Sequence, residues 1–482
     1  MNAFEPIRPE QDPAGKLAEM VVTTAFEDIP TAVVELAKRA ILDTLAVTIA
    51  GSNWEVSPQI VRQVVEWSGA PQSPILVHGQ RVPAPLAAFA NGVMARGIDM
   101  GDVHETGGHV TEWNVPAMLA ALGIAGKPVT GREFLTAYIT GGELSVRVNT
   151  AMNGTAHASF GVPGEYMGPL CATASVSRLL GLSVEETWNA LGIAYSNHGM
   201  SEMQKYAEGT QMARVQHSFA GETAIKAALL SRKGVTGPKG IFLGVPGGSF
   251  RHIGWSDVRP EVLTEDLGKR WIYAEGLSMK PYSACKFTHS FIAGAIEVMR
   301  LNRLDYRDIA SVLCIGSEGA RMTVEPREAK WNPKTVGEAL YSTPYTVATA
   351  IIGGDVFLGD FTIEEVNRPD KRALMQKIAV EFDPGIKEQF EGFTVEITLQ
   401  DGQVFRQRTP YVLGHTRNPM SWDDLGRKLS KCAAYAAVPL TEAKLNRLVE
   451  LCTDLDQVGD VSELLNALTP SNPDRHPEEA QP

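Results

Sequence analysis

The chain has 482 residues, of which 44% are hydrophobic, and its formal net charge at pH 7 is −12. A large core is therefore available, and the acidic balance argues against nucleic-acid binding, which needs a basic face. The five cysteines are odd in number and form no C-x-x-C pair, a pattern typical of a reducing compartment. The polar first segment does not fit a signal peptide, and no apolar run reaches the ~18 residues that span a bilayer. We therefore expect a cytoplasmic protein without membrane contact.

Residues 12–276 are expected to be mostly helical, because apolar residues recur in them at three- and four-residue spacing. One helix is expected to end at Gly51, and another to begin after Ser183 as its N-cap. The alanine and glycine content lets such helices approach closely, as they do inside a bundle. The expected helices lie within residues 29–52, 57–69, 82–98, 113–126, 131–152, 172–196 and 221–233.

The pattern changes after Lys280, where alternating apolar and polar residues indicate strands beside helices. Helices are expected within 289–304 and 342–361, and strands within 308–319, 375–384 and 390–410, the last with a hairpin turn in "LQDGQ". From residue 421 onward the chain is again helical, and we expect it to return to the first domain. The polar, proline-rich tail is expected to be disordered.

The segment Gly97–Trp113 interrupts the helical region with a dense group of titratable side chains. They are Asp99, Asp102, His104, Glu105, His109 and Glu112. A metal site would use Asp99, His104, Glu105 and His109. However, Gly107 and Gly108 break the helix that an H-E-x-x-H motif requires. An acid/base site explains the glycines better, because a loop between helices can point carboxylate and imidazole groups into a cleft. A solvated polar loop is the third possibility.

A second group of candidates lies in "MKPYSACKFTHSF", near the expected domain boundary. Lys280 precedes Pro281, which disfavours a helix at the lysine. Cys285, Lys286 and His289 follow, and taken alone they could form an ordinary linker with surface charges.

A third group precedes the helix expected at 221–233. It contains Lys205, Tyr206, Arg214 and His217, with Arg214 as a candidate carboxylate clamp. All three groups lie where helical periodicity breaks, and together they supply cations and acid/base side chains. The sequence therefore predicts a pocket for a small multi-anionic substrate that undergoes proton transfer beside a carboxylate.

Six segments, taken in chain order, carry a family resemblance. They are "NGVMARGIDMGDVH", "LLGLSVEETWNALGIA", "QMARVQHSFAGETAIKAALLSRKGVTGP", "KPYSACKFTH", "YSTPYTVATAI" and "NPMSWDDLGRKLS". Over about residues 15–460 the chain resembles the MmgE/PrpD family, which includes 2-methylcitrate dehydratase, cis-aconitate decarboxylase and iminodisuccinate epimerase.

The resemblance and the periodicity agree on a mainly α fold in two domains. A large all-helical domain is expected at 1–277 and 408–465, and a smaller α+β lid domain at 278–407, inserted before the C-terminal helices. Residues 466–482 form the expected disordered tail. The resemblance also implies a homodimer, an active site between the domains, and neither a metal nor an organic cofactor.

The family's site residues are carried over position by position. The first Asp of its D-F-D-D-like motif falls on Asp99, and the histidine ten residues later falls on His109. Its lysine falls on Lys280, the cation of the third group on Arg214, and the aromatic of its S-x-P-Y segment on Tyr345. Together with the groups above, the candidate catalytic residues are His109, Asp99, Lys280, Tyr345 and Cys285. The candidate substrate-binding residues are Arg214, Lys280, His217, His104 and Lys286.

Several positions depart from the family pattern. Gly101 replaces the second carboxylate of the D-F-D-D-like motif, and Val103 stands where the decarboxylase has a hydroxyl. Arg214 stands where the decarboxylase has Lys, and Cys285 stands where it has a second histidine. These departures leave the substrate open.

Three functions remain as hypotheses. The first is a cofactor-independent lyase that eliminates water from a hydroxylated di- or tricarboxylate, with His109 or Asp99 as general base and Lys280 and Arg214 holding the charge that develops. The second is another activity of the family, either epimerisation of a dicarboxylate, with Cys285 as a thiolate base, or decarboxylation of cis-aconitate. The third is a non-catalytic polycarboxylate binder on the same scaffold.

Overall fold

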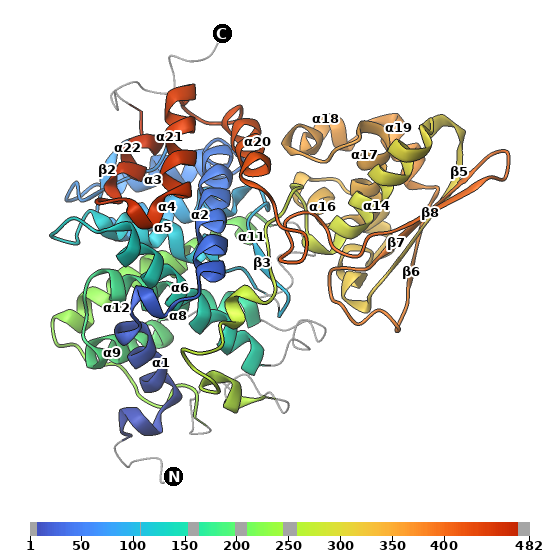
Figure 1. Cartoon of the computed structure of the whole chain (residues 1–482). Coiled ribbons are helices and arrows are strands. Elements are labelled where there is room, and N and C mark those ends of the chain that lie inside the picture. Colours follow the sequence, from blue (N-terminus) through green and yellow to red (C-terminus); the bar gives the residue numbers. More distant parts are fainter. Residues whose placement is uncertain (1–6, 107, 153–162, 198–209, 244–257, 471–482) are drawn as a thin grey trace.

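The computed structural model describes residues 7–106, 108–152, 163–197, 210–243 and 258–470. Two hydrophobic cores divide the described chain, one in a large helical body and one in a smaller body that contains a sheet (Figure 1). The mainly helical fold with a small mixed sheet in the C-terminal region confirms the predicted fold class. The expected tail begins too early, because residues 466–468 still belong to the last described helix of the chain, and residues 471–482 lie outside the described residues.

Helices from both ends of the chain build the larger core. They are α1 (Pro13–Thr23), α2 (Thr31–Gly51), α3 (Ser57–Trp67), α4 (Ala84–Gly97), α5 (Thr111–Leu122), α6 (Gly131–Ala151), α8 (Pro163–Leu179), α9 (Val184–Ser196), α11 (Met212–Val215), α12 (Phe219–Arg232), α20 (Trp422–Ala433), α21 (Glu442–Thr453) and α22 (Ser462–Leu468). A two-stranded ribbon of β1 (Ser73–Pro74) and β2 (Arg81–Val82) lies at its edge. The last three helices pack back onto this body, with α20 and α21 against α2 (Figure 1).

Local sequence determines several of these boundaries. Helix α2 ends at Gly51, and α9 begins after Ser183, as predicted. The Ser183 hydroxyl accepts a hydrogen bond from the Glu186 backbone N at 3.2 Å, and the Glu186 carboxylate accepts one from the Ser183 backbone N at 2.8 Å. This reciprocal capping satisfies two donors that a helix start would otherwise leave unpaired.

The smaller core lies between helices and one four-stranded sheet. The helices are α14 (Lys286–Asn302), α15 (Arg327–Trp331), α16 (Val336–Leu340), α17 (Thr343–Gly353), α18 (Ile363–Val366) and α19 (Pro369–Met375). The strands are β5 (Ile309–Gly316), β6 (Ile378–Phe382), β7 (Thr394–Leu399) and β8 (Val404–Arg408), in the order β6-β5-β7-β8. Strands β5 and β6 are parallel, and the other pairs are antiparallel.

The helix expected within 342–361 is shorter than predicted. It ends at Gly353 because Gly354 adopts a left-handed φ of +71° and caps it. Helices α15, α16, α18 and α19 were not expected from the pattern. Each has only four to seven residues, too few to show a helical period.

A small ribbon joins the two bodies. Strand β3 (Val103–His104), in the loop after α4, pairs antiparallel with β4 (Leu277–Ser278), just before Lys280. The backbone N of Met279 donates to the Gly414 carbonyl at 3.0 Å, which adds the returning segment to the same junction. The fold thus brings together the loop that carries Asp99 and the segment that carries Lys280.

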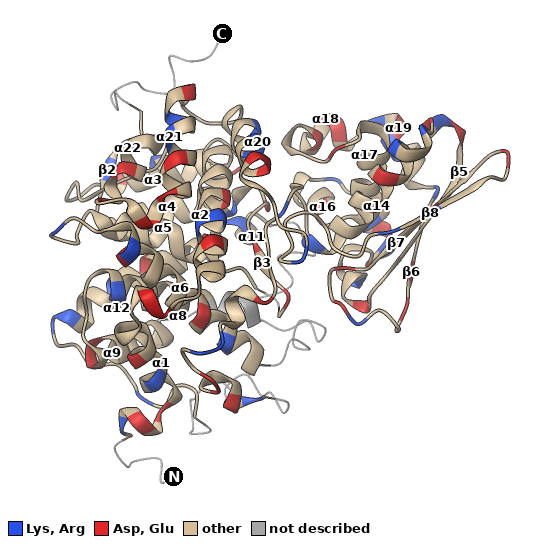
Figure 2. Ribbon diagram, viewed as in Figure 1, with Lys and Arg blue, Asp and Glu red and all other residues tan. Residues whose placement is uncertain are grey.

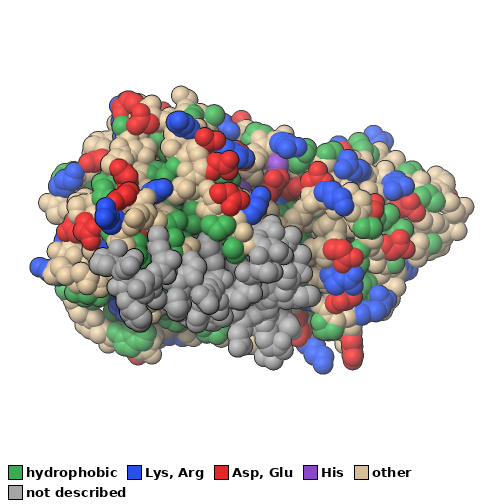
Figure 3. All heavy atoms as spheres, turned by 90° about the horizontal axis from the view of Figure 1, so that it is seen from below, with side chains coloured by type: hydrophobic (Ala, Val, Ile, Leu, Met, Phe, Trp, Pro, Cys, Tyr) green, Lys and Arg blue, Asp and Glu red, His purple; other side chains and the backbone are tan. Residues whose placement is uncertain are grey.

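Acidic and basic side chains alternate over the described surface. Lys and Arg are interspersed with Asp and Glu on both bodies in Figure 2, and the face in Figure 3 shows the same mixture outside its grey area. None of the described helices is long and apolar enough to cross a membrane.

Candidate active site

Asp102 anchors the loop between α4 and α5. One carboxylate oxygen accepts from the Thr111 backbone N at 3.1 Å, and the other from the Thr111 hydroxyl at 2.5 Å. The Thr111 oxygen bonds the Tyr138 hydroxyl at 2.6 Å. Burial raises the pKa of Asp102 to about 7, although the hydrogen bonds from Thr111 oppose the rise. Asp102 therefore caps α5 and fixes the loop on which the candidate residues lie.

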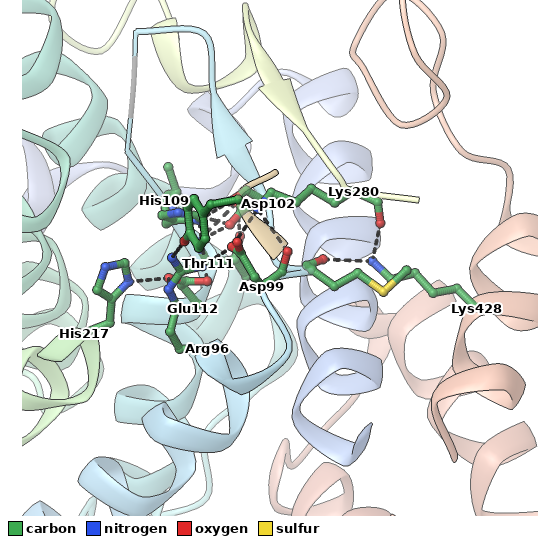
Figure 4. A network of polar contacts seen from close by, with 12 residues as sticks. Arg96, Asp99, Asp102, His109, Thr111, Glu112, His217, Lys280 and Lys428 are labelled. Atoms are coloured by element: carbon green, nitrogen blue, oxygen red, sulfur yellow. Dashed lines mark hydrogen bonds and ion pairs between the residues drawn. The ribbon is translucent and has the colours of Figure 1, made fainter. Parts of the chain in front are cut away.

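Asp99 receives two cations inside the protein (Figure 4). Its φ of +49° lies in the left-handed region, which Asp tolerates better than most residues. In this conformation Lys280 Nζ donates both to Asp99 Oδ1 at 2.9 Å and to the Asp99 carbonyl at 3.1 Å, and Arg96 Nη1 donates to Oδ1 at 2.5 Å. Burial alone would raise the pKa of Asp99, but Arg96 and Lys280 outweigh it and hold that pKa well below its usual range. Asp99 is thus a fixed anion that holds Lys280, and it is a weak proton acceptor at neutral pH.

His109 is a neutral imidazole with a defined tautomer. Its Nδ1 lies 2.6 Å from the Asp102 carbonyl, and because a carbonyl only accepts, Nδ1 carries the proton. Nε2 then holds the lone pair, and within the described ranges it has no hydrogen-bond partner. Burial is the main reason why the pKa of His109 is lowered to about 3; Glu112 opposes the change, and Arg96 and Lys280 contribute to it. His109 is therefore neutral at pH 7 with an open lone pair at Nε2, and its low pKa makes it a weak base.

Glu112 joins this group from the first turn of α5. Its Oε1 lies 2.5 Å from His217 Nδ1 and 3.6 Å from Arg96 Nε, and its Oε2 lies 3.5 Å from His109 Nδ1. Burial would raise the pKa of Glu112, but the neighbouring His109 and Arg96 lower it to about 2. A Cβ at Gly101 would lie 2.6 Å from Glu112 Oε2. Gly101, one of the departures from the family pattern, thus leaves room for this carboxylate.

Arg214 is a buried cation with unused donors. Its Nε lies 3.2 Å from Glu55 Oε2, and its guanidinium lies 6.0 Å from the centre of the Tyr341 ring. Neither Nε nor Nη2 has a hydrogen-bond partner of acceptable geometry among the residues that the structure describes. The Tyr341 hydroxyl accepts from Arg96 Nη2 at 3.2 Å, which connects Arg214 to the Asp99 group. A carboxylate that entered here would find two donors ready to bind it.

Cys285 lies at the start of α14, in the apolar core that also contains Val103 and Ala284. Burial raises the pKa of its thiol to about 11, Asp99 raises it further, and Lys280 opposes. The thiol is therefore protonated at neutral pH. It is suited to donate a proton, whereas the epimerase hypothesis required a thiolate base.

The chain matches one protein family over both of its bodies. Residues 15–260 match the MmgE/PrpD N-terminal domain, and residues 282–455 match the MmgE/PrpD C-terminal domain. The chain belongs to the MmgE/PrpD family.

Individual relatives in this family span nearly the same length. The chain is 28% identical to a cis-aconitate decarboxylase-like protein of Aspergillus oryzae, covering 95% of this chain and 97% of the relative. It is 28% identical to the cis-aconitate decarboxylase of Homo sapiens, covering 92% and 91%. It is 24% identical to the mitochondrial 2-methylcitrate dehydratase of Yarrowia lipolytica, covering 79% and 76%.

Of the candidates carried over from the MmgE/PrpD family, the structure brings most into one group. Asp99, His109, Lys280, Arg214 and His217 are linked to one another through contacts and charges, with Cys285 beside them. The candidates Lys205 and Tyr206 lie outside the described residues.

Tyr345 is placed elsewhere. Its hydroxyl donates to the Asp360 carbonyl, and its ring packs against Phe361 inside the smaller core, with centroids 5.7 Å apart. Tyr341, which lies before α17 instead of inside it, is the aromatic residue that reaches Arg96. The segment of the family motif is therefore at the site, but a different tyrosine in it makes the contact.

His104 and Lys286 also have other partners. His104 Nε2 lies 3.0 Å from the Ile272 carbonyl, and its Nδ1 accepts from the Thr106 backbone N at 3.2 Å, so the ring fastens the β3–β4 junction. Burial lowers the pKa of His104 to about 4, which keeps it neutral. Lys286 Nζ is paired with Glu391 Oε1 at 2.5 Å. In the structure both residues act as supports of the fold.

The four side chains that the metal hypothesis grouped are directed to separate partners. Asp99 binds Arg96 and Lys280, and Glu105 Oε1 lies 2.6 Å from His415 Nε2. His104 and His109 each bind a different backbone carbonyl. No group of three His, Cys, Asp or Glu side chains able to hold a metal ion occurs in the part of the chain that the structure describes.

Sequence reasoning gave no site role to three members of the group, although it noted Glu112 in the dense segment. Arg96 lies on a helix that is apolar on all sides, and a lone charge in such a helix must be buried with a partner; that was the available signal. Glu112 follows His109 by three residues at a helix start, where the two side chains share a face. For Tyr341 no signal separated it from Tyr345, because both lie in the same motif.

Proposed function

We propose that the protein is a lyase that decarboxylates an unsaturated tricarboxylate of the cis-aconitate type. The observation that carries the proposal is Arg214, a buried guanidinium whose Nε and Nη2 make no hydrogen bond among the described residues, although Nε lies in an ion pair with Glu55. A carboxylate is the ligand that satisfies two such donors together. Lys280 and Arg96 supply further positive charge within the same group.

The relatives support decarboxylation over elimination. Proteins named as cis-aconitate decarboxylases are 25–28% identical and cover more than nine-tenths of both chains. Those named as 2-methylcitrate dehydratases are 22–24% identical and cover smaller shares. The proposed substrate class follows the decarboxylases.

The reaction breaks one carbon–carbon bond and consumes one proton. The carboxylate that leaves becomes neutral CO2, and its electron pair enters the adjacent double-bond system, one carbon of which then takes up a proton. Lys280 and Arg214 hold the carboxylates that remain, where negative charge develops, and a fixed donor of this kind commonly contributes about 3 kcal/mol. Val103 and Ala284 belong to the same apolar core as Cys285, and an apolar surrounding there would favour a group that loses its charge.

Cys285 is the proposed proton donor. Decarboxylation needs a group that is protonated before the reaction, and the thiol, whose pKa is raised to about 11, is protonated at neutral pH. His109, in contrast, carries a lone pair at Nε2 and is neutral.

Elimination from a hydroxylated tricarboxylate is a second candidate, and the His109 tautomer favours it. This reaction begins with removal of a proton next to a carboxylate, and Nε2 of His109 holds the lone pair that could take it, although the low pKa of the imidazole makes it a weak base in the protein without substrate. The two reactions thus depend on different residues at one site.

The purified protein tests both candidates. We expect CO2 release from cis-aconitate, its loss in Cys285→Ala, and its partial retention in Cys285→Ser, which keeps a donor. Formation of an unsaturated acid from citrate or 2-methylcitrate that survives Cys285→Ala but not His109→Ala would replace decarboxylation by elimination. Deuterium uptake into unreacted substrate without product would indicate epimerisation, and a melting shift without turnover would indicate a binder. Wild-type turnover in both His109→Ala and Lys280→Ala would refute the site itself.

A further inference from the structure

Lys428, on α20, contacts the backbone of the segments that carry the candidate site. Its ammonium is buried, with 7% of the residue exposed, and it donates to three acceptors from three distant segments. Nζ lies 2.5 Å from Asp43 Oδ1 on α2, 2.8 Å from the Lys280 carbonyl and 3.1 Å from the Met100 carbonyl (Figure 4). The three N–H groups of an ammonium are therefore all used, and none remains for a substrate.

The two carbonyls belong to the segments that carry the central ion pair. Met100 follows Asp99 directly, and Lys280 is the residue whose own Nζ contacts Asp99. Lys428 thus holds the backbone on both sides of the Lys280–Asp99 contact. Asp43 fixes the ammonium from the opposite direction, because α2 and α20 pack against each other.

We propose that Lys428, oriented by Asp43, is a positioning residue that sets the contact between Lys280 and Asp99. The consequence for the reaction rests on the proposed function of Lys280. A displacement of about 1 Å at a reacting group can cost on the order of 10²-fold in rate. This role also gives a function to the C-terminal helices that pack on the larger body, because α20 carries the lysine that positions the site.

The alternative is a purely structural ion pair, and three variants separate the two roles. Lys428→Met and Asp43→Asn each leave a buried group without its partner, so both are expected to lower the melting temperature. The double variant Asp43→Asn/Lys428→Met removes both charges, and its melting temperature is expected to recover toward that of the wild type. Its carbonyls at Met100 and Lys280 still lack their donor. We therefore expect the double variant to be folded while its kcat is lower by about 10–100-fold, with a KM that rises less than that of Arg214→Gln because Arg214 is untouched.

Lys38 provides the matched control. Like Lys428 it is a buried lysine, but it lies on α2, where it is paired with Glu35 Oε1 at 2.9 Å and with Asp456. Lys38→Met is expected to lower the melting temperature without changing kcat of the folded protein.

A crystal structure of the double variant supplies a readout that needs no turnover. The expected result is a Lys280 Nζ that has moved from the 2.9 Å contact with Asp99 Oδ1. An unchanged contact, or a stable double variant with wild-type kcat, would overturn the positioning role. If the contact moves but the wild type does not decarboxylate cis-aconitate, the positioning role stands and the proposed function fails.

Discussion

Two buried lysines six residues apart, Lys280 and Lys286, show how a site differs from a support. Lys286 pairs with Glu391 Oε1 at 2.5 Å, and the other oxygen of Glu391 accepts from the Val412 backbone N at 2.9 Å. This pair is closed, because both oxygens of the carboxylate are satisfied. It joins α14 to the segment after the sheet and keeps the smaller body together.

The Lys280 pair is open. Its partner Asp99 is shared with Arg96, and Asp99 Oδ2 has no hydrogen-bond partner among the described residues. Nearby, Arg214 also keeps donors unused. Burying such groups costs free energy, which a chain bears where a ligand completes the network. Sequence analysis placed both lysines among the candidate substrate-binding residues and gave Lys280 a catalytic role as well.

The largest expected effect comes from exchanging each lysine for methionine, which keeps the length and removes the charge. Lys280→Met is expected to lower kcat/KM by about 10²–10³-fold, because a donor to the developing charge is lost. Lys286→Met leaves Glu391 buried without its cation, so the expected cost is about 3–5 kcal/mol of unfolding free energy with little change in kcat of the folded protein. Thermal melting and steady-state kinetics on both variants check this. If Lys280→Met lowered only the stability and Lys286→Met lowered only kcat/KM, Lys280 would be the structural lysine and Lys286 the functional one.

The second comparison concerns two buried arginines, Arg214 and Arg147. Arg147 is fully used, with hydrogen bonds to Glu143 at 2.7 Å and to the Val262 and Arg270 carbonyls at 2.8 and 2.9 Å. Arg214→Gln is expected to raise KM by about 10–100-fold, since hydrogen bonds to a charged group contribute about 1.5–3 kcal/mol.

Arg147→Gln is the control for this prediction. It is expected to lower the melting temperature and leave KM within about 2-fold of the wild-type value, because its donors serve the backbone. Titration with substrate at constant ionic strength measures both values. Equal KM values for Arg214→Gln and the wild type would remove Arg214 from the binding site.

Sequence patterns predicted the elements of the larger body because long helices display their period. The end of α2 at Gly51 and the cap at Ser183 were predicted for the same reason. The short helices of the smaller body, such as α16, contain too few residues for a period and depend on packing against the second core.

The candidate site was only partly predictable, because its members meet across long sequence separations. Asp99 and Lys280 could be proposed from motifs, but their contact depends on the pairing of β3 with β4. Strands of two residues are too short to be predicted from a sequence pattern. The support by Lys428 likewise depends on how α20 docks on α2. The choice of Tyr341 over Tyr345 is set by where α17 begins, a boundary of one turn that no periodicity resolves.

A third prediction compares Asp102 with Asp99 through pH. The folded-state pKa of Asp102 is raised to about 7 from an ordinary value near 4, whereas that of Asp99 is lowered. A raised pKa means that the folded state binds the proton more tightly than the unfolded state. The stabilisation from Asp102 is therefore present below about pH 4 and is lost as the pH rises through about 7, by at most on the order of 4 kcal/mol.

Asp102→Asn tests this, because the amide oxygen can still accept from Thr111 while the titration disappears. We expect the melting temperature of the wild type to fall relative to that of the variant between pH 5 and pH 8. Parallel curves for the two proteins would show that Asp102 does not titrate in this range. Asp99→Asn is the contrasting variant: it loses the pairing with Arg96 and Lys280 at every pH in this range.

The smallest effect is expected at Glu55, the ion-pair partner of Arg214. Its side chain is 21% exposed and its Oε2 is 3.2 Å from Arg214 Nε, so it competes with an entering carboxylate for the same cation. Partly exposed ion pairs contribute about 0.2–1 kcal/mol, so Glu55→Gln is expected to lower KM by about 2–5-fold without changing kcat. The gain in affinity should shrink at high salt, which screens this pair.

Glu222→Gln, which breaks the exposed pair with Lys226 on α12, is the matched control and should leave KM unchanged. A higher KM in Glu55→Gln would instead mean that Glu55 orients Arg214 for the substrate. In that case the wild type keeps the contact between Glu55 and Arg214 while the substrate is bound.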